Sequence, residues 1–572
     1  MMQAETLDHN SVLPLLNGEA LPAGLSANVL FGVIQGSQQV KVFHHEDLHS
    51  MQKFKVDGYI KDCGLHPVYT KVHVDEFQHL QDDDSETDEE YEATDAEDFF
   101  DQLFERAVEQ DASDIHIFVY PNDPHILFRI NGELERVTFQ ETIKSTKLMR
   151  VCNSIYSSMT GDTGSNLNSY RPELTQKATV KERRAINGHR FRLRYQDCAL
   201  DGDSNCVHVA MRLLDLDRDF TTSNLVELGY EADQQAMIYD VMLKGPGGLI
   251  VIVGATGDGK TTTAATILAQ YAQEHQGRKM ILTAEDPVEF KIDGVHHVQV
   301  SPSSEAETES QAWERHLAAK MRLDPDFIFQ GETRTVTTAE SACHAALTGH
   351  TTMVTLHGNS AFDALGRLEE LEVPRTLMGT AGFIKGVVFQ RLLPILCPKC
   401  SHKYSDYPDE KAYELVEKKI ATTALLNRLV TSYEPFTENV RFRNYDGCSE
   451  CRNGVIKREA VSELVILDEG MRRHILKGNY PAAKSEWKNQ GQIPAVPEAG
   501  TPYDEQYTQH CVGYEAFDHG IKKMIEGKVS PVDVEDKLGV LSSATVNMDS
   551  TIQGEEVNSL TGLAVSHLGD SA

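Results

Sequence analysis

The sequence has few basic residues for its length. Its 572 residues include 54 Lys and Arg against 87 Asp and Glu, a formal net charge of −33. Non-specific binding to DNA or RNA depends on basic surface, so this balance argues against a general polyanion binder, although a local basic groove remains compatible with it.

Long apolar runs are also absent, since no stretch approaches the roughly 20 apolar residues of a membrane-spanning helix. The first residues, MMQAETLDHN, do not resemble a secretory signal. We therefore expect a multidomain cytoplasmic protein.

Cysteine is too scarce for a disulfide scaffold, with ten residues in the whole chain. Four of them form two CxxC pairs, Cys397 with Cys400 and Cys448 with Cys451. Each CxxC turn directs two thiolates toward one point, and two turns complete a tetrahedral Zn²⁺ shell with no open position. We therefore expect a structural zinc site in a reducing compartment. A redox dithiol or a pair of disulfides is the alternative, but neither requires two such turns.

Charge is unevenly distributed along the chain. Residues 82–101 contain twelve acidic side chains and no basic one. Like charges at this density repel one another, so the segment is expected to be an extended, solvated linker. It separates residues 1–80 from the rest of the chain.

Two strand patterns follow the acidic segment. Alternating segments at 115–120, 125–130, 189–196 and 206–214 predict a small α+β domain rich in arginine. Continuous apolar segments at 248–254, 279–284, 327–331 and 352–356 alternate with helical stretches. This second pattern predicts a parallel sheet covered by helices on both faces.

A phosphate-binding loop is the clearest chemical motif. The segment from Gly254 to Thr261, GATGDGKT, fits GxxxxGK[ST] between a predicted strand and a predicted helix. The loop and the helix N-terminus present N–H groups to a polyphosphate, Lys260 reaches the β- and γ-phosphates, and the Thr261 hydroxyl helps to hold Mg²⁺. The predicted nucleotide-binding residues are Gly254, Thr256, Gly257, Gly259, Lys260, Thr261 and Thr262. Asp258 is unusual there, and we expect its carboxylate to point to solvent.

Polar side chains follow three of the predicted parallel strands. Glu285 and Asp286 follow the second strand, Glu332 the third and His357 the fourth. The carboxyl ends of parallel strands face a common crevice, where γ-phosphate hydrolysis needs carboxylates at the water and the metal. Glu332 is the best candidate to polarise the water. We interpret Glu289 and Asp324 as surface caps and His350 as a structural residue that closes a helix.

Together these residues resemble the secretion ATPase superfamily of type II secretion and type IV pilus assembly (the GspE/PilB kind). The resemblance runs from about residue 112 to 468 and includes ASDIHI, RINGEL, the phosphate loop, AEDPVEF, DPDFIFQGETR and AALTGHTTMVTLHGN. DGCSECRNGVIKREAVSELVILDE resembles the second half of the family's tetracysteine module.

The resemblance implies roles for particular residues. Glu285 and Asp286 belong to the family's Asp box and act at the metal and the water. Glu332 is the Walker B glutamate, and His357, in the His box, contacts the γ-phosphate side. Arg194 and Arg212 best match the arginines that the family brings to the nucleotide from its α+β domain. The chain departs from the family pattern at Ala255 and Asp258, at Thr333 and Thr335, and in the stretch 171–190.

The predicted fold is α/β, a RecA-like P-loop NTPase core preceded by a small α+β (PAS-like) domain. The expected order is a partner-docking domain (1–80), the acidic linker (81–110), the α+β domain (111–222), the core (223–395), a zinc-binding module with C-terminal helices (396–530) and a polar, disordered tail (531–572). The resemblance implies a homohexameric ATPase that uses ATP, Mg²⁺ and Zn²⁺ at the cytoplasmic face of the inner membrane. Its expected partners are a polytopic platform protein and a cytoplasmic adaptor that binds residues 1–80.

Several alternatives stay open at this stage. A pilus-retraction or conjugative-type ATPase of the same superfamily is disfavoured by the cysteine quartet. A nucleic-acid motor is disfavoured by the net charge, and no nucleic-acid partner is expected. A catalytically inactive ring scaffold is suggested by the altered residues after Glu332. The sequence does not decide which apparatus the protein serves.

Overall fold

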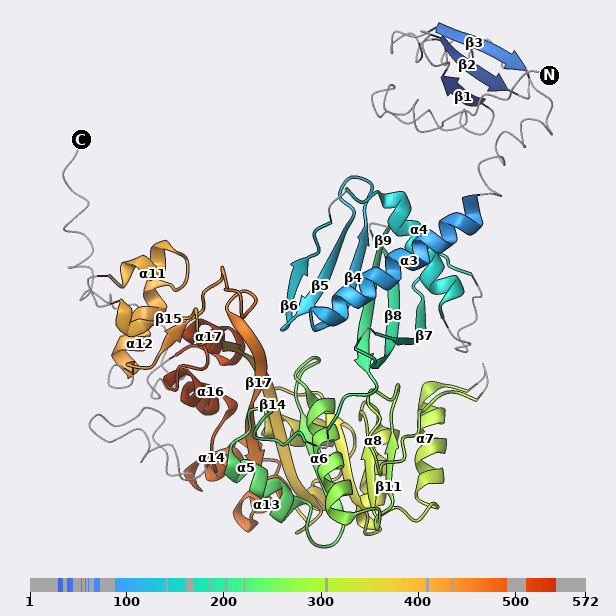
Figure 1. Cartoon of the computed structure of the whole chain (residues 1–572). Coiled ribbons are helices and arrows are strands. Elements are labelled where there is room, and N and C mark those ends of the chain that lie inside the picture. Colours follow the sequence, from blue (N-terminus) through green and yellow to red (C-terminus); the bar gives the residue numbers. More distant parts are fainter. Residues whose placement is uncertain are drawn as a thin grey trace, which may run out of the picture. The chain divides into compact units, whose positions relative to one another are not determined.

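The structure is a computed structural model of the whole chain (Figure 1). It describes residues 29–33, 39–44, 53, 57, 60 and 66–71, and then 88–541 except for 140–141, 161–168, 186, 201–202, 221, 304–306, 408–410, 434–436 and 491–510. The chain divides into two compact units, residues 1–103 with 146–158, and residues 104–145 with 159–572.

The first unit contains a three-stranded sheet in the order β1-β2-β3. Strand β1 (Val29–Val33) pairs antiparallel with β2 (Gln39–His44), which pairs parallel with β3 (His66–Lys71). Helix α4 (Ser145–Ser158) also falls almost entirely in this unit. Most of the expected partner-docking region, 1–80, lies outside the described residues.

Helix α3 (Asp88–Glu109) corrects the expectation of an extended acidic linker. From Ala96 onward its apolar residues recur at helical spacing, and Phe100, Leu103, Phe104 and Ala107 are buried. Phe104 packs edge-on against Phe191, with ring centroids 5.6 Å apart. Asp95, Asp98 and Asp101, in contrast, are exposed. Burial of one face of the helix therefore outweighs the repulsion that the charge count alone suggests.

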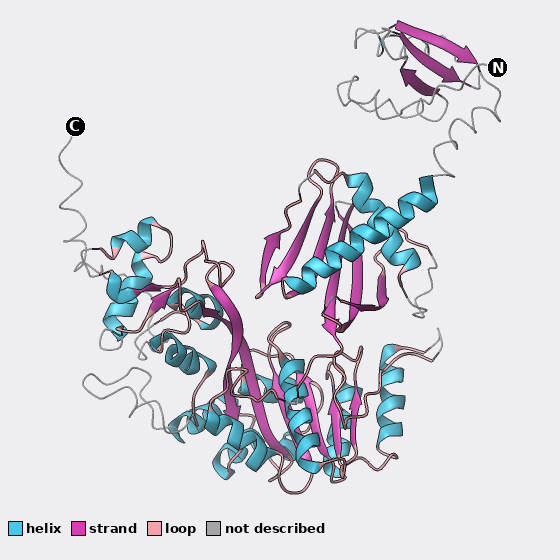
Figure 2. Ribbon diagram, viewed as in Figure 1, coloured by secondary structure: helices cyan, strands magenta, loops and turns pink. Residues whose placement is uncertain are grey.

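The α+β domain contains a six-stranded antiparallel sheet in the order β6-β5-β4-β9-β8-β7 (Figure 2). All four strands predicted for this region are confirmed, and β6 and β7 are additional. The bounds are β4 (Ala112–Val119), β5 (His125–Ile130), β6 (Glu133–Arg136), β7 (Lys177–Arg184), β8 (Arg190–Leu200) and β9 (Asp203–Asp215).

The core sheet has the order β11-β12-β13-β10-β14-β17 (Figure 2). The first five strands are parallel, and β17 pairs antiparallel with β14. The four predicted strands are confirmed, and all their residues are buried, as expected for a sheet covered on both faces. The bounds are β10 (Gly248–Val253), β11 (Ile281–Ala284), β12 (Phe327–Gln330), β13 (Thr351–Leu356), β14 (Ile384–Leu396) and β17 (Val455–Val465).

Side chains alternate along β10 between two apolar clusters, one on each face of the sheet. Ile250 and Ile252 pack with buried residues of helix α6, whereas Leu249, Val251 and Val253 pack with those of α8 and α9. The helices before and around the sheet are α5 (Ala232–Ala236), η2 (Met237–Met242), α6 (Lys260–His275), α7 (Glu309–Lys320), α8 (Val336–Leu347), α9 (Ala361–Glu370) and α10 (Arg375–Met378).

The C-terminal region extends the core instead of forming a separate body. Strand β17 completes the core sheet, so the expected core boundary at residue 395 omits one of its strands. Helix α17 (Pro531–Leu538), with Val534 buried, lies inside the expected disordered tail, while residues 542–572 lie outside the described part. The remaining elements are β15 (His402–Lys403), η3 (Tyr404–Asp406), α11 (Tyr413–Glu417), α12 (Thr423–Tyr433), β16 (Arg441–Phe442), α13 (Glu469–Leu476), α14 (Tyr480–Gln490), α16 (Ala516–Ile525) and α17 (Pro531–Leu538).

Among the described residues, none of the helices combines the length and apolar character that a bilayer crossing requires.

Candidate functional site

The phosphate loop connects the buried strand β10 to helix α6. At Gly254 the backbone of a neighbouring strand leaves no room, since a Cβ there would lie 2.7 Å from the Gln390 carbonyl oxygen. Gly259 precedes α6 with φ of 76°, a left-handed conformation that side chains disfavour. The local backbone therefore explains why these two positions are glycine. The loop leads directly into the helix N-terminus, as the sequence predicts.

Lys260 is turned toward its own loop. Its Nζ donates hydrogen bonds to the carbonyl oxygens of Gly254 (2.9 Å) and Ala255 (3.0 Å). Burial lowers the pKa of Lys260, and the negative charges of Glu332, Asp258 and Glu289 oppose that effect. The lysine is thus held among carboxylates at the place where the predicted phosphates bind.

The expectation that Asp258 points to solvent is wrong. Its Oδ2 accepts a hydrogen bond from the Ala255 N–H (2.9 Å), and its Oδ1 accepts one from the Leu392 N–H (3.4 Å). The side chain of Gln390 also donates to the Asp258 carbonyl oxygen at 2.6 Å. Backbone donors therefore stabilise this carboxylate inside the loop, and they link the loop to β14.

Glu332 follows β12 and forms the centre of a charged group. His357, which follows the neighbouring strand β13, places its Nε2 2.8 Å from Glu332 Oε1, and Arg334 donates to Oε2. Burial opposes ionisation of Glu332, but the Arg334 hydrogen bond and the positive charges of Arg334, His357 and Lys260 outweigh it and lower the pKa of Glu332. The carboxylate is therefore kept ionised, as a group that accepts a proton or orients water must be.

The carboxylates of the Asp box differ in exposure, and Glu289 is not placed as expected. Glu285 is only 5% exposed, whereas Asp286 is exposed. Glu289 does not behave as a surface cap, because it interacts with the side chain of Thr261, the predicted Mg²⁺ ligand. Burial raises the pKa of Glu289, which the Thr261 contact opposes. Asp324 is exposed, in agreement with its interpretation as a surface residue.

The chemistry of this group suits Mg²⁺. A hydroxyl oxygen from Thr261 and a carboxylate from Glu289 are in contact, and oxygen ligands of these kinds are those that Mg²⁺ prefers. The remaining ligands of such an ion are typically waters and substrate phosphates.

Arg194 and Arg212 are opposite each other on neighbouring strands β8 and β9. Arg212 Nε donates to Asp114 Oδ1 at 2.9 Å. Both arginines are among the positive charges that lower the pKa of Glu289 against the effect of its burial. The two residues predicted from the family pattern are therefore brought near the Asp box.

Arg458, on β17, belongs to the same charged region and was missed by the sequence reasoning. Burial lowers its pKa, whereas the charges of Asp258 and Asp114 act in the opposite direction. His297, which contacts Glu285, was also missed. The paired histidines 296 and 297 shortly after the Asp box were the only sequence signal for it.

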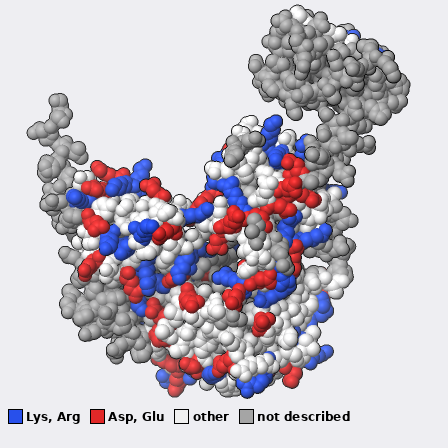
Figure 3. Space-filling view, in the orientation of Figure 1, with Lys and Arg blue, Asp and Glu red and all other residues white. Residues whose placement is uncertain are grey.

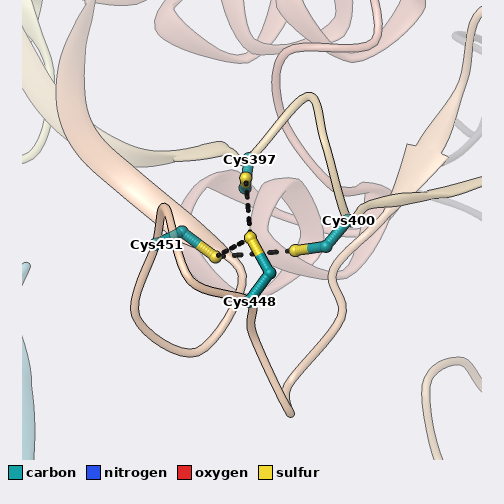
Figure 4. Close-up of side chains that lie close together, drawn as sticks. All are labelled: Cys397, Cys400, Cys448 and Cys451. Carbon is teal, nitrogen blue, oxygen red and sulfur yellow. Dashed lines mark hydrogen bonds between the residues drawn. The ribbon is translucent and has the colours of Figure 1, made fainter.

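The four cysteines converge as predicted (Figure 4). Their sulfur atoms all lie within 4.8 Å of one another, and the sulfur separations are 3.8 Å for Cys397–Cys448, 3.5 Å for Cys400–Cys451 and 3.6 Å for Cys448–Cys451. A tetrahedron with Zn–S bonds of about 2.3 Å has edges of about 3.8 Å, so the quartet fits Zn²⁺. Four thiolates leave no position for a substrate, which fits a structural site.

The visible charge pattern is mixed. On the face drawn in Figure 3, Lys and Arg are interspersed with Asp and Glu and do not form one continuous basic track.

The sheet order, the phosphate loop and the carboxylates after β11 and β12 define the P-loop NTPase fold with a RecA-like core. The chain belongs to the family described as Type II/IV secretion system protein, which matches residues 89–501. This confirms the family resemblance recognised in the sequence motifs.

Individual relatives agree with this assignment. The chain is 31% identical over 376 residues to the type II secretion system ATPase E of Vibrio cholerae, covering 64% of this chain and 65% of the relative. It is 32% identical over 392 residues to the type IV pilus assembly ATPase PilB of Thermus thermophilus, covering 67% and 38%. The chain thus spans just under two thirds of the Vibrio relative's length.

A solved structure supports the fold. The X-ray structure of the Legionella pneumophila ATPase DotB matches with a TM-score of 0.50 and 20% identity, covering 76% of this chain and 94% of DotB. At this level of identity the likeness concerns the fold alone.

Proposed function

We propose that the protein is an ATP-hydrolysing motor that powers type IV pilus assembly or type II secretion pseudopilus assembly. The main support is the group formed by Lys260, Glu332 and His357 at the carboxyl ends of β10, β12 and β13. The names of the related proteins from Vibrio cholerae and Thermus thermophilus agree with this activity.

The proposed chemistry assigns a distinct task to each residue. Loop N–H groups and Lys260 bind the phosphates, and Glu332 orients the attacking water. His357 and Arg334 keep the Glu332 carboxylate ionised and oriented. Thr261 and Glu289 would hold Mg²⁺, which neutralises phosphate charge when bound. Glu285 and Asp286 supply the remaining Asp box carboxylates, and Glu285 lines one small cavity together with Thr261 at the start of α6.

We further propose that the active form is a homohexamer at the cytoplasmic face of the inner membrane. Arg194 and Arg212 would stabilise phosphate charge where nucleotide lies between the α+β domain of one protomer and the core of the next. Closure and reopening of that interface during hydrolysis would drive a polytopic platform protein. Residues 1–80 would bind a cytoplasmic adaptor.

The cysteine quartet would hold one structural Zn²⁺ in this assembly. Cys397 follows β14 directly, and Cys451 lies four residues before β17. A closed metal site at this position would fix the connection between two neighbouring strands of the core sheet.

The test measures ATP hydrolysis by the purified full chain, alone, with the platform protein in lipid vesicles and with single- or double-stranded DNA. The expected result is Mg²⁺-dependent hydrolysis that the platform protein accelerates and DNA does not. Stimulation by DNA alone would favour the nucleic-acid motor, and no hydrolysis under any condition would favour the inactive scaffold.

A further inference from the structure

Residues outside the recognised sequence motifs hold the Asp box glutamate Glu285 in place. Glu285 follows the last residue of β11, and its backbone bridges Gln299 on the returning segment of chain. The same segment carries His297, which is 12% exposed at the side chain. His297 Nδ1 lies 2.8 Å from Glu285 Oε1.

The hydrogen bonds of His297 assign its tautomer. The backbone N–H of Ile292 donates to His297 Nε2 at 3.1 Å. A backbone N–H can only donate, so Nε2 must carry a lone pair, and the ring proton is then on Nδ1. The Nδ1–H donor therefore points at Glu285 Oε1, and the imidazole is fixed from both of its nitrogen atoms.

A second group fixes the strand that precedes Glu285. Lys320, the last residue of α7, is only 2% exposed, and its Nζ donates to the carbonyl oxygen of Thr283. Thr283 lies two residues before Glu285 on β11. A buried ammonium group is costly unless it is paired, and here the Glu285 carboxylate supplies the opposing charge.

Glu285 lies close to the start of helix α6. Glu285 and His297 line a small cavity of about 10 Å³ together with Thr261, the predicted Mg²⁺ ligand at the start of α6. A shift of the Glu285 side chain would therefore change its position relative to the phosphate loop.

We infer that His297 is a positioning residue that holds the Glu285 carboxylate toward the nucleotide site, and that Lys320 fixes the end of β11 behind it. This inference rests on the proposed ATP hydrolysis. A group of this kind reduces the freedom of the functional side chain without touching the substrate. Misplacement of a functional group by about 1 Å can cost about 100-fold in rate.

The test uses substitutions that separate the donor from the packing. His297→Asn keeps an N–H donor near the position of Nδ1, whereas His297→Leu keeps bulk without a donor. We expect His297→Leu to lower kcat about 10- to 100-fold with the KM for ATP nearly unchanged, and His297→Asn to restore most of the rate. Lys320→Met removes the second donor and is expected to lower kcat, with Lys320→Arg as its conservative control.

Equal rates for wild type and a folded His297→Leu protein would overturn the inference, as would equal losses in His297→Asn and His297→Leu. A second readout is independent of turnover. In protein labelled with ¹⁵N-histidine, NMR is expected to show His297 as the neutral Nδ1–H tautomer, and the Nε2–H tautomer would overturn the inference even in a chain that hydrolyses no ATP. Absence of ATP hydrolysis in the wild type, with the Nδ1–H tautomer present, would instead count against the proposed function.

Discussion

The carboxylate of Glu289 interacts with the side chain of Thr261, so the Asp box reaches the first turn of the helix that follows the phosphate loop. The two residues are 28 positions apart and belong to different motifs. Their contact joins the proposed metal-binding hydroxyl to a carboxylate that the sequence alone does not single out.

This contact predicts a magnesium phenotype for Glu289→Gln. Loss of one carboxylate charge is expected to raise the Mg²⁺ concentration for half-maximal ATP hydrolysis several-fold, because hard cations bind carboxylates more strongly than amides. Titration of ATPase activity with MgCl₂ measures the effect. Asp324→Asn, at an exposed carboxylate of the same core, is the matched control, and identical titration curves for the two variants would contradict the prediction.

The position of Asp258 predicts that removing its negative charge increases the affinity for ATP. Its charge acts on Lys260, and its side chain is held inside the loop by the Ala255 N–H. Asp258→Asn keeps an oxygen acceptor for that N–H and removes a negative charge that repels phosphate. We expect the Kd for ATP, measured by calorimetry, to fall several-fold. An unchanged or higher Kd in the correctly folded variant would show that the charge is not a barrier to binding.

The cysteine quartet predicts one zinc ion per chain. Cys400→Ser is expected to lose the metal and to lower the melting temperature by several degrees, because the binding free energy of a structural zinc contributes to folding. Elemental analysis and thermal unfolding measure the two effects. Cys198→Ser, a cysteine outside the quartet, is expected to keep both the metal and the stability. Retention of zinc in Cys400→Ser would contradict the assignment.

Asp533 predicts a pH-dependent gain in stability. Burial raises its pKa to about 7 from the usual 3.8, and its Oδ2 has no hydrogen-bond partner among the residues that the structure describes. The folded state therefore binds a proton at Asp533 more tightly than the unfolded state does. Because of this, the free energy of unfolding falls as the pH rises from about 4 to 7. Asp533→Asn is expected to stabilise the protein at pH 8 by on the order of 2 kcal/mol and to have little effect near pH 4.

Thermal unfolding of wild type and Asp533→Asn at both pH values measures this difference. A variant that is no more stable than the wild type at pH 8 would contradict the expected cost of burying the ionised carboxylate.

Much of the core could be predicted from sequence because its signals are local. The four apolar strands and the phosphate loop are continuous segments, and the parallel order of β11, β12 and β13 then places Glu285, Glu332 and His357 at one edge. The CxxC pairs likewise require only that two turns meet.

The parts that could not be predicted depend on contacts between distant segments. The orientation of Asp258 depends on the Leu392 N–H of β14, and Glu289 is identified only by its contact with Thr261. Strand β17 joins the core sheet from beyond the cysteine quartet, so a boundary drawn from composition omits it. The many acidic residues of α3 predicted an extended linker, but the segment is an amphipathic helix whose buried face includes Phe100 and Phe104.

The most direct measurement compares ATP binding and ATP cleavage in Glu332→Gln and Lys260→Ala. If Glu332 orients the water and Lys260 binds phosphate, Glu332→Gln will bind ATP with near wild-type affinity and cleave it at least about 100-fold more slowly. Lys260→Ala will bind ATP weakly. Wild-type hydrolysis by either variant would contradict the proposed site.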